Sequence, residues 1–437
     1  MNIFLLLLII ILIILIILYI YYQMNTKIPK EYYFDNNATT FVYDKKIKDE
    51  INKWINCGNP SNILHKLGQD AKNQLELSRQ IISEDLNVNK DEVYFTGCAT
   101  ESNNIILTDI INNFLKNGKG NATIITDNIE HPSILHILDN YKQNPRLNII
   151  TLKVITDKTN IYYGTLDPHD LEETILNNEN VILISLMYAN NETGAIQDIE
   201  TFGKLSKKYN IFFHCDATQA IGKFVIHPKE LNINAMTFSG HKFHAPKGVG
   251  CLYIQSYCPM LGKSSIDICN QFKINSQERG VRGGTENIAF ISAMSLALQE
   301  VHKNRIQKNF KLKAYKNYII KQLEYNNCEV IKPYYSLDNT ILVILKGISC
   351  CNKQFAKELN DKYHICLGVS SACQQSKSHI IDAMNIQDCY QDKIIRISMS
   401  DYNTSEEIKY LVSSIIELLN KYRKTSEYNE NKDKNID

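Results

Sequence analysis

The sequence contains no Cys-x-x-Cys pair, and its 12 cysteines follow no regular spacing. Secreted disulfide scaffolds are shorter and more evenly spaced, and zinc sites need clustered cysteine and histidine residues. The cysteines are therefore expected to be reduced thiols, of which one or two are reactive. The absence of ligand clusters also predicts that the chain holds no resident metal.

The chain has no excess of charge of either sign, since its 437 residues carry a formal net charge of +1. Nucleic-acid binding requires clustered basic residues, so nucleic acid is not expected as a direct partner. Internal repeats are absent too. A composition with 44% hydrophobic and 22% charged residues is that of a globular protein, and the length suffices for two domains.

The N-terminus departs from this composition, because Ile3–Tyr22 is almost wholly isoleucine and leucine. A helix of that length covers roughly 30 Å, one bilayer core. No basic stretch precedes the run and no Ala-x-Ala site follows it, which favours an uncut anchor over a cleaved signal peptide. A buried core helix is the other alternative. Lysines follow the run, so residues 1–24 are predicted to form a single-pass membrane anchor with the catalytic body on the cytosolic side.

From Tyr33 onward, short β-type runs alternate with helical stretches. Such repeated units predict an α/β fold with a mostly parallel sheet sandwiched by helices, in which ligands bind beyond the carboxyl ends of strands. Strands are expected at Val93–Thr96, Thr123–Thr126, Asn148–Leu152, Val181–Met187, Ile211–Cys215, Ala235–Phe238 and Gly250–Ile254, and helices at Asn62–Asp85, Glu101–Lys116, Ser133–Tyr141 and Ile199–Tyr209.

A long helical run, Glu286–Gln322, is expected to lead into a second unit. Its strands are expected at Thr340–Leu345 and Ile394–Ser398, and its helices at Lys353–Asp361 and Glu406–Tyr422. The predicted domains are a large domain at residues 25–300, whose first residues pack on the other unit, and a smaller α+β domain at 301–425. Residues 426–437 are charged, lack large aliphatic side chains and are predicted to be disordered.

Polar motifs lie at the expected strand ends. In Phe95–Asn104 a helix opens at Thr100, where backbone N–H groups and a hydroxyl make a seat for phosphate, although a capped helix without a ligand has the same pattern. His131 suits stacking on a flat ring and proton transfer, although a single histidine is more often structural. Asn191 can donate to a ring hydroxyl, or it belongs to a polar turn.

Two further motifs complete a set. Asp216 ends a buried strand, where a carboxylate either protonates a pyridine nitrogen or caps the next helix, and Gln219 can reach a ring oxygen. Lys242 ends Ser239–Lys242. Taken alone, Lys242 is best interpreted as a surface lysine, but a desolvated lysine can also form a Schiff base with a carbonyl cofactor. Together the motifs predict a pocket for pyridoxal 5′-phosphate.

The sequence resembles the cysteine desulfurases of the class V pyridoxal-phosphate-dependent aminotransferase group, which have the type I fold. The resemblance is closer to the iron–sulfur-cluster branch than to the selenocysteine lyases. The motifs that carry it stand in family order: YFDNNATT (33–40), GNPSNILHKLG (58–68), FTGCATESNN (95–104), EHPSI (130–134), YANNETG (188–194), CDATQ (215–219), SGHK (239–242), ERGVRGGTEN (278–287), SSAC (370–373) and IRISMS (395–400).

The resemblance implies a role for each matching position. Lys242 is the Schiff-base lysine and proton carrier, His131 the stacking acid–base residue, and Asp216 the partner of the pyridinium. Cofactor contacts are further implied for Ala99, Thr100, Asn191, Gln219, Ser239, His241 and Thr285. Thr285 would reach across from a second subunit, which implies a homodimer. Asn37, Asn191 and Arg396 are implied to bind the substrate, with Arg396 on its carboxylate.

Cys373 matches the family's nucleophile. Its setting, GVSSACQQSKS (368–378), is small and polar, as a mobile loop requires. A thiolate there can take the substrate sulfur and carry it outward as a persulfide, whereas a core cysteine is inert. Cys373 is also the residue expected to touch a transient iron–sulfur cluster. Cys98, which follows Gly97, departs from the small residues that are usual in the phosphate turn.

The resemblance therefore implies conversion of L-cysteine to L-alanine, with the sulfur passed to an acceptor protein or thiol for iron–sulfur clusters or tRNA thiolation. A selenocysteine lyase or a related class V lyase or aminotransferase would use the same pocket without Cys373. A non-catalytic tethered scaffold would bind no cofactor.

Overall fold

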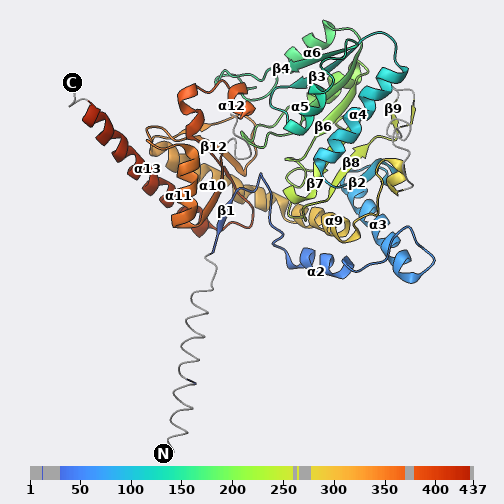
Figure 1. Cartoon of the computed structure of the whole chain (residues 1–437), viewed down its shortest axis with the longest axis horizontal. Helices are drawn as coiled ribbons and strands as arrows, with labels where there is room; N and C mark the ends of the chain where they lie inside the picture. Colours follow the sequence, from blue (N-terminus) through green and yellow to red (C-terminus); the bar gives the residue numbers. More distant parts are fainter. Residues whose placement is uncertain (1–11, 13–29, 259–262, 265–276, 370–377, 434–437) are drawn as a thin grey trace, which may run out of the picture.

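The computed structural model describes Leu12 and residues 30–258, 263–264, 277–369 and 378–433. Within these residues the strands form two main sheets, which Figure 1 shows side by side. A short two-stranded ladder, β9 (Tyr257–Cys258) with β10 (Lys263–Ser264), stands apart from both sheets.

A seven-stranded sheet is the framework for most of the polar motifs. Its order is β2-β8-β7-β6-β5-β3-β4, and β8 runs antiparallel to both of its neighbours while the others share one direction. This arrangement confirms the predicted α/β class with a mostly parallel sheet. The strands are β2 (Val93–Thr96), β3 (Ala122–Asp127), β4 (Leu147–Leu152), β5 (Val181–Met187), β6 (Phe212–Asp216), β7 (Ala235–Ser239) and β8 (Gly250–Ile254).

Both faces of this sheet are covered by helices. Successive strand residues point to opposite faces, so Ile124 and Ile125 are both fully buried yet belong to two different apolar clusters, as do Phe212 and Phe213. One face packs against α4 (Ala99–Asn117) and α5 (Pro132–Asp139), and the other against α3 (Lys66–Asp85), α7 (Ile199–Lys208) and α9 (Ile288–His302). Helix α2 (Lys45–Trp54) contacts α9, and α6 (Pro168–Leu176) contacts α7.

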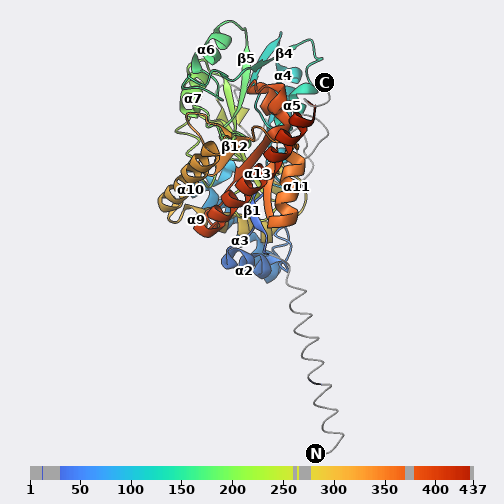
Figure 2. The same cartoon turned by 90° about the vertical axis from the view of Figure 1, so that its left-hand side faces the viewer.

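A five-stranded sheet carries the rest of the chain, in the order β1-β13-β14-β12-β11. Strand β1 pairs in parallel with β13, and the remaining pairs are antiparallel. Figure 2 shows α13 lying lengthwise between α10 and α11, and both pairs are in contact. The elements are β1 (Tyr32–Phe34), β11 (Glu329–Ile331), β12 (Thr340–Ile344), β13 (Ile365–Val369), β14 (Ile394–Ser398), α10 (Arg305–Tyr325), α11 (Asn352–Tyr363), α12 (His379–Ala383) and α13 (Ser405–Asp433).

Two helices differ from the sequence-based expectation. The run Glu286–Gln322 forms two helices, because Asn304 has a φ of 56° between α9 and α10. Asparagine tolerates this left-handed conformation, which ends a helix. Helix α13 continues to Asp433, into the tail for which the sequence predicts disorder. The division into domains at residues 24, 300 and 425 stays a prediction.

The predicted membrane anchor is contradicted, and with it the membrane localisation of the catalytic body. Among the described parts of the chain, no helix combines the length and the apolar character needed to cross a bilayer. The segment predicted as the anchor, residues 1–24, lies outside the described residues except for Leu12. The prediction of an anchor is therefore withdrawn.

Candidate functional site

Lys242 stands just beyond the C-terminal end of β7, in the short 3-10 turn Gly240–Lys242. Its Nζ donates hydrogen bonds to the backbone oxygens of Asn37 at 2.7 Å and Ala38 at 2.9 Å. Burial lowers the pKa of Lys242 to about 8, and the positive charge of Arg396 acts in the same direction. A useful fraction of this amine is therefore neutral, and so nucleophilic, close to neutral pH.

Asn37, which follows β1, connects four of the predicted site residues. Its backbone oxygen accepts from Lys242 and from Gln219 Nε2, the latter at 3.0 Å. Its Nδ2 donates to the backbone oxygen of Asn191 at 3.0 Å, and that same oxygen accepts from Arg396 Nη1 at 3.1 Å. The site therefore forms where the start of the five-stranded sheet meets the strand ends of the seven-stranded sheet.

Asp216 ends β6 with its carboxylate buried in a fixed network. Asn103 Nδ2 donates to its Oδ2 at 3.0 Å, and the backbone N–H of Thr218 donates to its Oδ1 at 2.9 Å. Asn103 is itself fully buried, and its Oδ1 accepts from Thr237 Oγ1 at 2.6 Å. The two donors hold both carboxylate oxygens in fixed positions, as a partner of a pyridine nitrogen requires.

His131 caps the N-terminus of α5 and lies beside this network. Its Nδ1 is 2.8 Å from Ser133 Oγ and accepts from the Ser133 backbone N–H at 3.1 Å. Asn103 Nδ2 donates to Ser133 Oγ at 3.0 Å, which links the imidazole to the partner of Asp216. Burial lowers the pKa of His131, while the charge of Asp216 opposes that shift. The ring is therefore neutral at neutral pH and able to accept a proton.

The phosphate seat predicted at α4 is built from backbone and hydroxyl groups. The N-cap position of α4 is Cys98, whose side chain makes no capping hydrogen bond. The backbone N–H of Ala99 donates to Ser239 Oγ at 2.7 Å, which ties β7 to the helix start. A Cβ on Gly250 would lie 2.7 Å from the Cys98 backbone, so glycine there lets β8 approach this turn. Cys98 thus lines the seat with its backbone.

His241 directly precedes Lys242 in the turn that follows β7. Its Nδ1 is 3.0 Å from Thr39 Oγ1, and burial lowers its pKa to about 4, with the charge of Lys242 adding to the effect. The ring is neutral and offers one N–H to an anion. The start of α4 and the turn after β7, which are joined through Ser239, offer donors to a phosphate. Asp216 offers a buried carboxylate and Lys242 an amine, so the residues present fit pyridoxal phosphate.

Arg396, on β14, is a cation whose charge acts on Lys242. Its Nη2 forms an ion pair with Asp35 Oδ1 at 2.6 Å, and its side chain is 11% exposed. Its Nε is buried and has no hydrogen-bond partner among the described residues. The guanidinium therefore keeps a donor that an incoming carboxylate could use.

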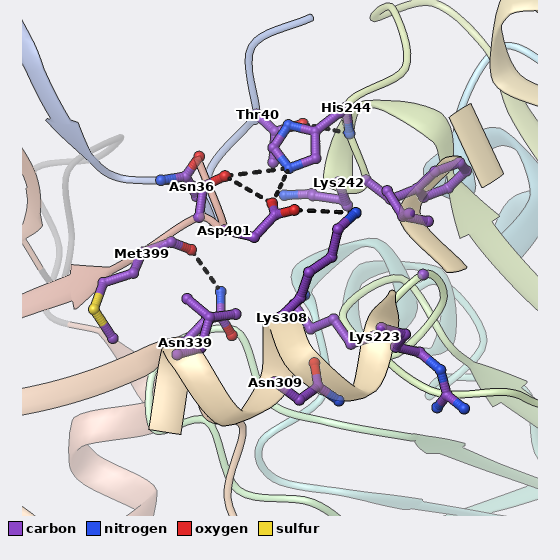
Figure 3. Close-up of a pocket in the computed structure, with 16 residues that line it drawn as sticks. Asn36, Thr40, Lys223, Lys242, His244, Lys308, Asn309, Asn339, Met399 and Asp401 are labelled. Atoms are coloured by element: carbon purple, nitrogen blue, oxygen red, sulfur yellow. Dashed lines mark hydrogen bonds and ion pairs between the residues drawn. The ribbon is translucent and has the colours of Figure 1, made fainter. Parts of the chain in front are cut away.

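A cavity of about 70 Å³ lies beside Lys242, and Figure 3 shows Asp401 there between His244 and Lys308. Lys308 Nζ is 3.1 Å and His244 Nε2 is 3.5 Å from the Asp401 carboxylate. Burial alone would raise the pKa of Asp401, but these two partners hold it well below its usual range. The negative charge of Asp401 thus partly offsets the positive charges of the lysines that line this cavity, Lys223, Lys242 and Lys308.

Lys223 lines the same cavity (Figure 3) and supports a site residue. Its Nζ donates to the backbone oxygen of Gln219 at 2.7 Å and to Gln219 Oε1 at 3.3 Å. Burial lowers the pKa of Lys223 to about 7, and the charge of Lys242 adds to the shift. The cavity therefore belongs to the same site, since its lysine holds the amide of Gln219.

Some predicted residues are not joined to this network. Thr285 is exposed in the segment before α9, and Thr100 is exposed in the first turn of α4. Cys373 lies outside the described residues. Conversely, sequence reasoning missed Asp35, Asn103 and Lys223. Asn103 could have been found from the sequence, because it belongs to the motif Phe95–Asn104 and lies about one helical turn after Thr100.

The chain matches the aminotransferase class-V family over residues 32–411. Among curated relatives, the cysteine desulfurase IscS of Buchnera aphidicola subsp. Baizongia pistaciae is 32% identical, with 90% of this chain and 94% of that protein covered. The cysteine desulfurase IscS of Methanosarcina thermophila is also 32% identical, with 91% and 94% covered.

A solved structure of a NifS-like protein superimposes with a TM-score of 0.79 at 31% identity. The match covers 90% of this chain and all of that one. The likeness therefore shows a similar fold over nearly the whole chain.

Proposed function

Because the chain belongs to the class-V aminotransferase family, we propose that it is a pyridoxal-phosphate-dependent cysteine desulfurase of the type I fold. It converts L-cysteine and a thiol to L-alanine and a persulfide. The observation that carries this proposal is the single hydrogen-bonded network that joins Lys242, Asn37, Gln219, Asn191 and Arg396 beside the buried Asp216.

Each residue of the network has a task that its surroundings support. Bound pyridoxal phosphate supplies an electron sink for the bond changes at the substrate Cα. Asp216 would face the ring nitrogen and hold its positive charge, and His131 would stack on the ring. Lys242 Nζ holds the cofactor in the resting enzyme and then moves a proton at the substrate Cα, which its lowered pKa allows.

The phosphate contacts are proposed for the start of α4 and the turn after β7. Ala99 and Thr100 present the first turn of α4 to the anion. Ser239 already accepts a hydrogen bond from Ala99, so its own proton is available for a phosphate oxygen. His241 adds a neutral N–H. Thr285 is exposed and is proposed to complete the seat of a second subunit, which would make the enzyme a homodimer.

The sulfur step is proposed for Cys373. Its thiolate attacks the sulfur of bound L-cysteine, the C–S bond breaks, and the electron pair stays with the carbon that becomes the alanine methyl group after protonation. The persulfide on Cys373 is then taken by an acceptor protein or thiol. Iron–sulfur clusters and thiolated tRNA are the proposed destinations of this sulfur.

The proposal is tested on the wild-type protein reconstituted with pyridoxal phosphate. We expect visible absorbance from the bound cofactor, a change in that absorbance on addition of L-cysteine, and one alanine released for each persulfide or sulfide. Cofactor binding without alanine formation would reject the desulfurase assignment. Turnover of selenocysteine alone would favour a selenocysteine lyase.

Replacement of Arg396 by glutamine is expected to raise KM for L-cysteine by about 10- to 100-fold. The lost hydrogen bonds to a carboxylate are worth about 1.5 to 3 kcal/mol, which corresponds to that range of affinity. Arg396→Lys keeps the charge but loses the planar fork and should give an intermediate KM. Steady-state kinetics check this, and an unchanged KM in Arg396→Gln would remove Arg396 from substrate binding.

A further inference from the structure

Helix α12 is attached to the large sheet by two polar contacts next to the site. Ser378 Oγ lies 3.0 Å from both carboxylate oxygens of Glu192, and His379 Nε2 lies 2.9 Å from the backbone oxygen of Glu130. We propose that Ser378 and His379 are positioning residues that fix one end of the segment containing Cys373. This inference rests on the proposed function of Cys373.

The two acceptors are neighbours of site residues and are held rigidly with respect to each other. Glu192 directly follows Asn191, and Glu130 directly precedes His131. Asn190 joins the two turns, because its Oδ1 accepts from the backbone N–H of Glu192 at 2.8 Å and its Nδ2 donates to the Ile129 oxygen at 3.1 Å. Asn190 is fully buried, so α12 is fastened to two turns that are hydrogen-bonded to each other beside the site.

Apolar packing and the polar contacts have separate effects on α12. Ile380 and Ile381 are each 2% exposed and belong to the apolar cluster on one face of the large sheet. That burial holds the helix against the sheet without setting its register, since apolar contact is not directional. The hydroxyl of Ser378 is directional. It donates to Glu192 and accepts from the backbone N–H of Ile380 at 3.3 Å.

Chain length then limits where Cys373 can be. Cys373 precedes Ser378 by five residues, and five residues span at most about 18 Å when fully extended. On the other side, Val369 is paired with Ile395, the neighbour of Arg396, and Cys373 follows Val369 by four positions. Both attachment points lie beside site residues, so a loss of the Ser378 contact would widen the range of positions open to the thiol.

Two matched replacements of Ser378 separate positioning from helix capping. Asparagine and aspartate are equally good N-cap residues, but the amide of Ser378→Asn can donate to Glu192, whereas the carboxylate of Ser378→Asp repels it. We expect S378D to form alanine at least tenfold more slowly than wild type in a single turnover. S378N should remain within about twofold. KM for L-cysteine and the cofactor absorbance change should be the same in both.

A charge swap provides the control. In the double variant E192Q/S378D, the glutamine amide donates to the new carboxylate, and alanine formation should recover to within about threefold of wild type. Equal rates in S378D and S378N, or no recovery in the double variant, would overturn the proposal. If S378D does not fold, the double variant should fold and be active, and its failure to do so would also overturn the proposal.

A readout independent of turnover separates this inference from the proposed function. Alkylation of Cys373 by iodoacetamide, followed by mass spectrometry of the digested protein, should be at least threefold faster in S378D than in S378N. Wild-type protein that forms no alanine would reject the desulfurase function, while this difference in alkylation would still support the attachment of α12. Equal alkylation rates would reject the attachment whatever the activity.

Discussion

A Cys373→Ala variant is expected to bind the cofactor and L-cysteine as wild type does and to form no measurable alanine. The alanine side chain at position 373 has no sulfur to attack the substrate, whereas the hydrogen bonds described around Lys242 and Asp216 join other residues. The variant should show the same absorbance change on substrate addition, with the rate of alanine release reduced by at least 10³-fold, the scale on which loss of a covalent nucleophile acts. Chromatographic measurement of alanine checks this.

Cysteines that are wholly or partly buried among the described residues are poor candidates for the same step. Several have thiols whose pKa burial raises, so they remain protonated and weakly nucleophilic at neutral pH. These are Cys57, Cys215, Cys251, Cys328, Cys350 and Cys366. Cys389 is exposed on the surface and serves as the matched control, because Cys389→Ala should leave alanine formation unchanged. Normal turnover by Cys373→Ala would exclude Cys373 from the mechanism.

Replacement of Lys242 by alanine is expected to lower alanine formation by at least 10³-fold and to prevent borohydride from fixing the cofactor to the chain. Nζ is the amine through which the chain would bind the cofactor, and it is also the proton carrier at the substrate Cα. Cofactor held by the phosphate seat alone should wash out on gel filtration. Mass spectrometry after borohydride treatment checks the covalent link, and Lys223→Met, which leaves Lys242 in place, should retain it.

The lowered pKa of Lys242 gives this prediction a pH dependence. Only the neutral amine attacks an aldehyde, and the neutral fraction rises as pH passes through the pKa. The rate at which apo protein takes up pyridoxal phosphate should therefore increase from pH 6 and level off above a midpoint near the pKa of about 8. Loss of the positive charge in Arg396→Gln should move that midpoint upward. A midpoint near 10.5 in both proteins would show that the amine is not desolvated.

Much of the fold could be predicted from the sequence, because buried strands carry a local signal. The strands expected at Val93–Thr96, Val181–Met187, Gly250–Ile254 and Ile394–Ser398 have the same bounds in the structure. Where prediction differed, a single residue or a long-range contact decided the outcome. Asn304 breaks a continuous helical pattern by adopting a left-handed conformation, and no periodicity in the sequence indicates that choice.

In the candidate site, too, some residues could be predicted from local sequence patterns and others depend on long-range contacts. Motifs at strand ends identified Asp216 and Lys242, because side chains at the ends of parallel strands converge. Asp35 and Lys223 could not be found in this manner. Asp35 pairs with Arg396 across 361 residues of sequence, and Lys223 acts through the amide of Gln219. The resemblance to a family supplied roles for the matched positions. It supplied none for residues such as Asp35 and Lys223, which contact the matched side chains and hold them in position.

The pairing of β1 with β13 bears on how the protein matures after it leaves the ribosome. Strand β1 is made early and its partner more than 300 residues later, while Asn37, next to β1, holds the amine of Lys242 and the amide of Gln219. Contacts between such distant parts of a chain form slowly. A nascent chain could thus complete the seven-stranded sheet, yet Asn37 would be fixed beside Lys242 only once β13 has been made and has paired with β1.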